Sequence, residues 1–222
     1  MSQTSKPIRV DIVSDVVCPW CVIGYYQLIA GARQARIELE THWHPFELNP
    51  SMVAGGENLR EHLAAKYGTT PEGSRNARAR LSAMGAALGF AFNYADDMRM
   101  YNTFLAHQLI DWAETQGFGH PVKLALFEAY FTHRSDVSQI DVLVETAGRV
   151  GLDKNDARNV LEAEERAANV RARQETWRAR GISGVPAMIF DQKYLVTGAQ
   201  GEYNYAEILK KVVSEKMTET VN

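Results

Sequence analysis

The sequence predicts an α/β fold in which a long helical block separates a strand–helix–strand unit from a strand–strand–helix unit. Three features support this: β-branched runs near the start, helical periodicity in the middle, and two short apolar runs near the end. Residues Ile8–Val13 and Ile37–Leu48 indicate the first two strands. A helix is expected between them over Pro19–Ala35, because proline is well tolerated in the first helical turn. Asn49 and Pro50 close this unit.

The middle of the chain, residues 52–180, shows apolar side chains at helical spacing almost throughout. Thr70 and Asp153 are expected to be N-caps of two of its helices. Ser138 and Asp141 resemble a capping box, with Asp in place of the usual Glu. The block therefore reads as a series of separate helices.

The chain is expected to end in a β-hairpin and a helix. Ala187–Phe190 and Tyr194–Thr197 are apolar runs around a polar turn, and Tyr205–Met217 has helical periodicity. The order βαβ…ββα is that of a thioredoxin fold carrying a large all-helical insertion. We therefore expect a discontinuous thioredoxin-like domain and an insertion domain, with the boundaries 1–50 plus 181–222 and 51–180.

Composition narrows the function classes. The formal net charge of −3 gives no reason to expect nucleic acid or a membrane surface as the main partner. The first residues lack the pattern of a signal peptide, and no apolar run approaches about 18 residues. These features predict a cytoplasmic protein, and both a monomer and a homodimer remain open.

The two cysteines of the chain form one tight motif, Cys18-Pro19-Trp20-Cys21. At the start of a helix, Cys18 would face unpaired N–H groups and the positive end of the helix dipole, which favour the nucleophilic thiolate. Cys18 would then form a mixed disulfide with a substrate, and Cys21 would resolve it. Pro19 and Trp20 lie between the two cysteines in the sequence and would modify the reactivity of the pair. The motif therefore predicts thiol–disulfide chemistry.

Other uses of this motif are less well supported. Zinc needs four ligands, and no second cysteine pair exists, although His42 and His44 could add two. Haem attachment needs a histidine after the second cysteine, where Val22 stands. A purely structural disulfide is not expected in a reducing compartment. We predict neither a metal site nor a bound cofactor.

Gly184-Val185-Pro186 precedes the expected hairpin. In a thioredoxin fold this position holds a cis proline beside the cysteines, and an X–Pro bond reaches the cis form at low cost. The backbone of Val185 would then be free to pair with an extended substrate. The alternative is a trans proline that starts a strand. We favour the cis form, which makes Pro186 part of the predicted site.

The combined motifs resemble a known family. Segments 15–21, 46–50, 184–186 and 198–200 resemble the FrnE-like branch of the DsbA family, and the resemblance spans nearly the whole chain. It implies a thioredoxin fold, disulfide oxidoreductase activity on protein or small-molecule substrates, and no bound cofactor. Cys18, Cys21 and Pro186 match the active-site pattern of that family.

Two positions depart from the family pattern. Periplasmic DsbA proteins have a histidine where this chain has Trp20, so we expect a weaker oxidant, with a potential below about −120 mV. The buried acid that usually lies six residues before the first cysteine is replaced by Ile12, and Asp11 is on the opposite strand face. Glu47, at the end of the second strand, is a candidate for its proton-transfer role, but we favour a solvated or hydrogen-bonded glutamate.

The sequence leaves two other functions open. Kappa-class glutathione transferases and related isomerases resemble this architecture, but they usually have serine where Cys18 stands. A zinc- or peptide-binding module is the other alternative. A run of arginines predicts a solvated helix face. The same run could bind an anion, so glutathione remains a candidate substrate. That run comprises Arg75, Arg78 and Arg80.

Overall fold

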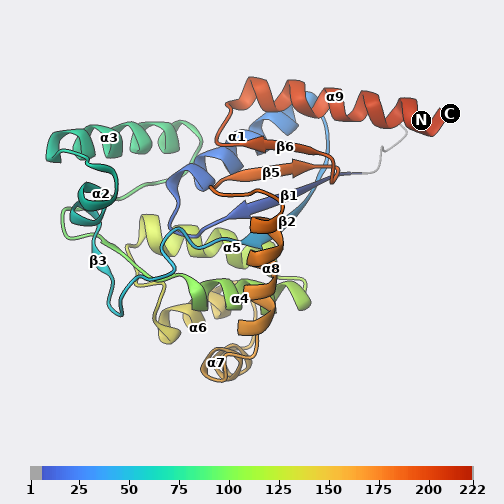
Figure 1. The fold of residues 1–222 in the computed structure, drawn as a ribbon. Helices are drawn as coiled ribbons and strands as arrows, with labels where there is room; N and C mark the ends of the chain where they lie inside the picture. The colour runs from blue at the N-terminus through green and yellow to red at the C-terminus, as the bar shows by residue number, and fades with distance from the viewer. Residues whose placement is uncertain (1–6, 222) are drawn as a thin grey trace.

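The computed structural model describes residues 7–221, and its centre is a four-stranded sheet (Figure 1). The strand order is β2-β1-β5-β6, where β1 runs parallel to β2 and the other neighbours are antiparallel. This is the expected thioredoxin topology. The strands are β1 (Ile8–Ser14), β2 (Leu39–Pro45), β5 (Ala187–Phe190) and β6 (Tyr194–Thr197).

Two helices, α1 (Pro19–Ala35) and α9 (Glu202–Val221), pack together over one face of the sheet. Gly31 permits their close approach, because a Cβ at this position would lie 2.7 Å from the Glu202 carbonyl oxygen and 2.9 Å from the Ala206 nitrogen. The bounds of α1 and of both hairpin strands are those predicted. Helix α9 extends beyond the predicted bounds at both ends.

The inserted segment is helical, apart from a two-residue antiparallel ladder between β3 (Glu57–Asn58) and β4 (Arg99–Met100). Helix α8 contacts β2 on the face opposite α1, whereas α5 contacts β2 through Trp43, which also packs against Tyr25 of α1. A π-helical turn, Glu128–Thr132, continues α5. The helices are α2 (Leu59–Tyr67), α3 (Pro71–Ala87), α4 (Phe104–Thr115), α5 (Gly119–Phe127), α6 (Ile140–Arg149), α7 (Lys154–Glu162) and α8 (Ala167–Ala179).

Two of the predicted helix caps are confirmed and the third is wrong. Thr70 accepts a hydrogen bond from the N–H of Gly73, and Asp153 accepts two at the start of α7, as expected. The capping box at Ser138 is wrong. Ser138 donates its hydroxyl and backbone N–H to Asp136, and Gln139 begins α6 without a side-chain cap. The nearer carboxylate competes successfully for the serine.

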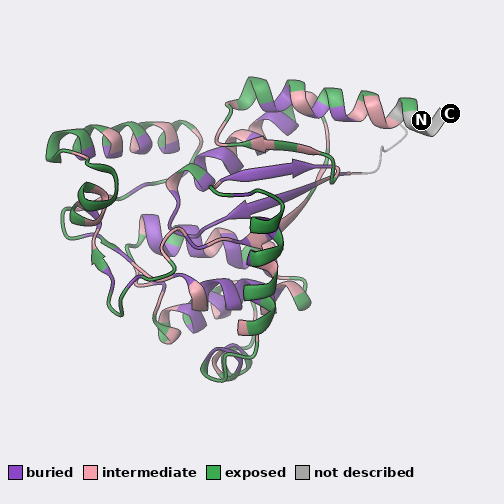
Figure 2. Cartoon of the chain, viewed as in Figure 1, coloured by how far each residue is buried: buried purple, intermediate pink, exposed green. Residues whose placement is uncertain are grey.

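One continuous apolar core joins the sheet to the insertion. It includes Val10 and Ile12 of β1, Leu28 of α1, and Leu109 and Leu126 of α4 and α5. Strands β1 and β5 are buried almost throughout (Figure 2). The two predicted domains therefore share their core. Among the described helices, none has the length and apolarity needed to cross a bilayer.

Candidate active site

The cysteine motif lies where β1 gives way to α1. Cys18 is the N-cap of α1, with an extended backbone, and Pro19 opens the helix. Cys21 lies one turn in, and its N–H donates to the Cys18 carbonyl at 3.1 Å. Both thiols are free and buried, whereas Trp20 is 45% exposed. The predicted arrangement at a helix N-terminus is therefore present.

Residues distant in sequence complete one wall of the site. The Val185–Pro186 peptide bond is cis. Cys18 Sγ lies 3.7 Å from the Val185 carbonyl oxygen. A Cβ at Gly24 would lie 3.3 Å from Pro186 Cγ, so a glycine lets α1 pack directly against this proline. The loop before β5 is thus held against the cysteine-bearing turn.

A buried lysine lies beneath the cysteines. Lys123 comes from α5 and is 1% exposed. Its Nζ lies 4.8 Å from the Phe127 ring centre and 5.3 Å from that of Trp43. Burial lowers the pKa of Lys123 to about 8, and the opposing attraction of Cys21 and Asp15 favours its charged form. A positive charge is therefore available to the inner sulfur.

A buried carboxylate, Asp15, accompanies this lysine. The Leu48 N–H donates to Asp15 Oδ2 at 2.7 Å, and His107 Nε2 lies 3.4 Å from Oδ1 while donating to the Phe46 carbonyl at 2.9 Å. Burial alone would raise the pKa of Asp15. The close contact with His107, the hydrogen bond from the Leu48 N–H and the charge of Lys123 outweigh burial, so the pKa of Asp15 lies below its usual value.

The two thiols ionise as a pair. The S–H of one can donate to the thiolate of the other, so the first proton leaves easily and the second is held. Burial would raise the pKa of Cys21, but the Cys18 thiol, Lys123 and the Ser14 hydroxyl lower it. The hydrogen bond with Cys21, together with burial, raises the pKa of Cys18. Between its two ionisations the pair therefore holds one shared proton, and the charge of Lys123 favours this state.

Comparison with known proteins gives this geometry a family. A family model described as the DSBA-like thioredoxin domain matches residues 9–210. The chain belongs to this family. Its DsbA-like architecture agrees with the resemblance noted in the sequence.

Several relatives of this DsbA-like chain are informative. A probable DsbA oxidoreductase from Streptomyces coelicolor, SCO1869, has a crystal structure with a TM-score of 0.87 and 30% identity, covering 94% of this chain and 91% of its own. YwbO, an uncharacterized protein of Bacillus subtilis, is 24% identical over 94% of this chain and 97% of its own. The cytosolic disulfide reductase DsbM of Pseudomonas aeruginosa, solved with GSH, shares the fold at 15% identity, with a TM-score of 0.62 and coverage of 93% and 99%.

Two side chains of the DsbA-like chain that were considered for proton transfer lie elsewhere. Glu47 is buried, pairs with Arg171 and accepts from Gln174 at 3.0 Å, so its carboxylate binds α8. This agrees with the interpretation of Glu47 as a hydrogen-bonded residue. Asp11 pairs with Arg9 and His44, both at 2.7 Å. Asp15 is the carboxylate whose charge acts on Cys18.

The histidines proposed as zinc ligands have other partners in the DsbA-like fold. His42 lies 2.9 Å from Glu40, and His44 bonds to Asp11. Within residues 7–221, no cluster of three or more His, Cys, Asp or Glu side chains is arranged to hold a metal ion.

Sequence reasoning missed Lys123 and Asp15. A signal for Lys123 was present, because it is four residues before Phe127 and next to Val122, on the apolar side of a helix. Asp15 stands three residues before Cys18, within the segment that carries the family resemblance. Neither residue type is ordinarily buried without a partner.

Proposed function

We propose that this DsbA-like chain is a thiol–disulfide oxidoreductase that uses Cys18 and Cys21 as its redox pair. The observation that carries the proposal is the Cys18 sulfur at the N-terminus of α1, 3.7 Å from the carbonyl before cis Pro186. The helix N-terminus favours a thiolate at Cys18, whereas burial and the hydrogen bond with Cys21 raise its pKa. Transfer of the shared proton to Cys21 would leave Cys18 as the nucleophilic thiolate. Two cysteines in one tight motif also favour action in a reducing compartment, the cytoplasm.

The proposed reaction has two exchange steps. The Cys18 thiolate attacks one sulfur of a substrate disulfide, so a Cys18–substrate bond forms and the other substrate sulfur leaves as a thiolate. Cys21 then attacks Cys18 and releases the second substrate thiolate. The substrate gains two electrons and the protein ends as the Cys18–Cys21 disulfide. The reverse sequence would oxidise a dithiol.

The test is a titration of the pair against a glutathione redox buffer, followed by the fluorescence of the half-exposed Trp20. We expect a reversible two-electron transition with a midpoint below about −120 mV. A chain without any transition would contradict the proposal.

Matched variants examine the order of the two cysteines. Cys21→Ser should accumulate a mixed disulfide with an added disulfide substrate, because the resolving thiol is absent. Cys18→Ser should accumulate none. Accumulation on the Cys18→Ser variant alone would reverse the assigned roles.

A further inference from the structure

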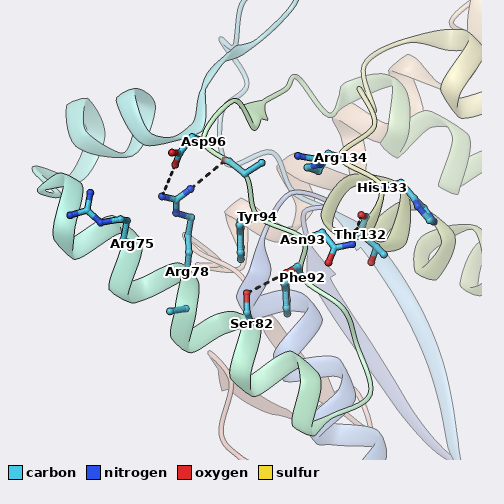
Figure 3. A pocket seen from close by; sticks show the side chains of 12 residues that line it. Arg75, Arg78, Ser82, Phe92, Asn93, Tyr94, Asp96, Thr132, His133 and Arg134 are labelled. Carbon is cyan, nitrogen blue, oxygen red and sulfur yellow. Dashed lines mark hydrogen bonds and ion pairs between the residues drawn. The ribbon is translucent and has the colours of Figure 1, made fainter.

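A cationic hollow opens between α3, the segment 92–96 and the end of the π-helical turn (Figure 3). Its volume of about 940 Å³ suits a small ligand. Arg75 and Arg78 reach it from α3, and Arg134 reaches it from the other side. Asp96 is the only carboxylate among the described lining residues. The hollow therefore carries an excess of positive charge.

Arg78 has a buried hydrogen-bond donor without a partner. It is 9% exposed, and its contacts with the Ala95 carbonyl at 3.3 Å and with Asp96 at 3.4 Å are long. Its Nε is buried and has no hydrogen-bond partner. Leaving a buried donor unpaired costs free energy, and a guanidinium fork matches a carboxylate. The prediction of a solvated arginine face is therefore wrong for Arg78.

The other two arginines have weak ties. Arg134 lies 3.7 Å from Asp97, whose side chain is exposed. Arg75 is exposed and makes no ion pair with any described residue. Both are free to turn towards an anion in the hollow.

Tyr94 connects the hollow to the cysteines. Burial raises the pKa of Tyr94, the charge of Cys18 raises it further, and the charge of Arg78 lowers it. The phenol is thus within electrostatic range of both Cys18 and Arg78. The ring of Tyr94 stacks on that of Phe92 with centres 5.7 Å apart, and this contact orients Tyr94 in the wall of the hollow. Helix α3, which carries Arg75 and Arg78, also packs against α1, whose N-cap is Cys18. The hollow therefore lies beside the helix that bears the cysteine.

We propose that this hollow binds the carboxylate of a low-molecular-weight anionic disulfide and presents its sulfurs to Cys18. The inference rests on the proposed oxidoreductase function and adds its substrate class. The arginines supply charge-assisted hydrogen bonds to the carboxylate. Asp96 competes with the substrate for Arg78.

Three small disulfides of similar size test the charge preference: dithiodipropionate (anionic), bis(hydroxyethyl) disulfide (neutral) and cystamine (cationic). Reduced protein is mixed with each, and the second-order rate constant is read from Trp20 fluorescence. We expect the anionic disulfide to react fastest and the cationic one slowest. The preference should diminish at high salt, because exposed charges are screened.

Variants then locate the effect. The double variant Arg75→Gln/Arg134→Gln should slow the anionic disulfide about fivefold and leave the neutral one unchanged. Asp96→Asn should accelerate the anionic disulfide. Arg80→Gln is the matched control, since Arg80 is exposed on α3 outside the hollow, and it should change nothing. These exposed sites avoid disturbing the buried Arg78.

The outcomes separate the two proposals. If all three disulfides react equally, or if Arg80→Gln has the effect of the double variant, the anion site is wrong and the oxidoreductase function stands. If the neutral disulfide does not react and the redox titration shows no transition, the function itself is wrong.

Discussion

Among the charged residues near the thiol pair, Lys123 has the largest effect on Cys21. Its buried ammonium favours a thiolate at Cys21, whereas the charge of Asp15 disfavours one at Cys18. Lys123 and Asp15 carry opposite charges and therefore have opposite effects on the ionisation of the thiol pair. Neither residue needs to touch the substrate to set the reactivity of the pair.

Lys123→Met should raise the pKa at which the reduced pair first ionises by about one unit, since a nearby cation is lost. Asp15→Asn should lower it, because a nearby anion is lost. The measurement is the ultraviolet absorbance of the thiolate against pH, with Cys18→Ser and Cys21→Ser assigning the signal. Shifts of the same sign in both variants would contradict this electrostatic account.

The sequence predicted the covalent chemistry at residue scale and missed its electrostatic environment. Cys18, Cys21 and Pro186 belong to local motifs, so their spacing is visible in the chain. Lys123 reaches the site only because α5 packs against β2. No local pattern encodes a contact between residues about a hundred positions apart.

At the scale of elements, the crossing of α1 and α9 depends on Gly31. Gly31→Val should lower the free energy of unfolding by about 3 kcal/mol, because its side chain would overlap backbone atoms of α9. Gln34→Val, at an exposed position of α1, should cost about 0.5 kcal/mol through helix propensity. Urea unfolding measures both. Equal losses would mean that the crossing is loosely packed.

A buried carboxylate of α4, Asp111, helps to dock α8, together with Glu47 and Glu114. Asp111 is 3% exposed and accepts from Arg166 and Arg173 at 2.6 Å and from Asn169 at 2.8 Å. The predicted helix boundaries could not reveal this, because its partners lie more than fifty residues away. The interaction fixes α8 beside the end of β2, where Arg173 also donates to the Trp43 carbonyl at 2.7 Å.

Asp111→Asn should lower the free energy of unfolding by about 3 kcal/mol, since two arginines lose a buried partner. Asp141→Asn is the matched control, because the side chain of Asp141 is 83% exposed and pairs only with Arg158. It should cost less than about 1 kcal/mol. Hydrogen exchange should show faster opening of α8 in the first variant alone. Unchanged exchange there would assign the docking to the other contacts of α8.

On the scale of the whole molecule, one apolar core spans the thioredoxin-like part and the insertion. The sequence indicated two domains because helical and strand periodicities alternate along the chain. Periodicity shows which face of an element is apolar, but it does not show what that face packs against. The continuous core joins the two parts, as do the contacts of Asp15 with His107 and of Lys123 with Trp43. The cysteine pair therefore lies where the two parts meet.

Three buried aspartates give the stability of the fold a pH dependence. For Asp11, Asp15 and Asp111, burial raises the pKa, but hydrogen bonds and nearby cations outweigh it, so each folded-state pKa is below the unfolded value. An aspartate with a lowered pKa stabilises the fold above its unfolded pKa of about 3.9. That stability is lost as the pH falls through 3.9 towards the folded pKa, because unfolding then takes up protons.

Each such carboxylate contributes a slope of about 1.4 kcal/mol per pH unit in that window. We therefore expect stability to urea to change little between about pH 7 and pH 5 on account of these groups and to fall steeply below about pH 4. Asp111→Asn should reduce the slope of the unfolding free energy against pH in the acid range by the contribution of one carboxylate, about 1.4 kcal/mol per pH unit. Asp141→Asn should leave that slope unchanged. Parallel slopes for wild type and Asp111→Asn would show that Asp111 keeps an ordinary pKa in the fold.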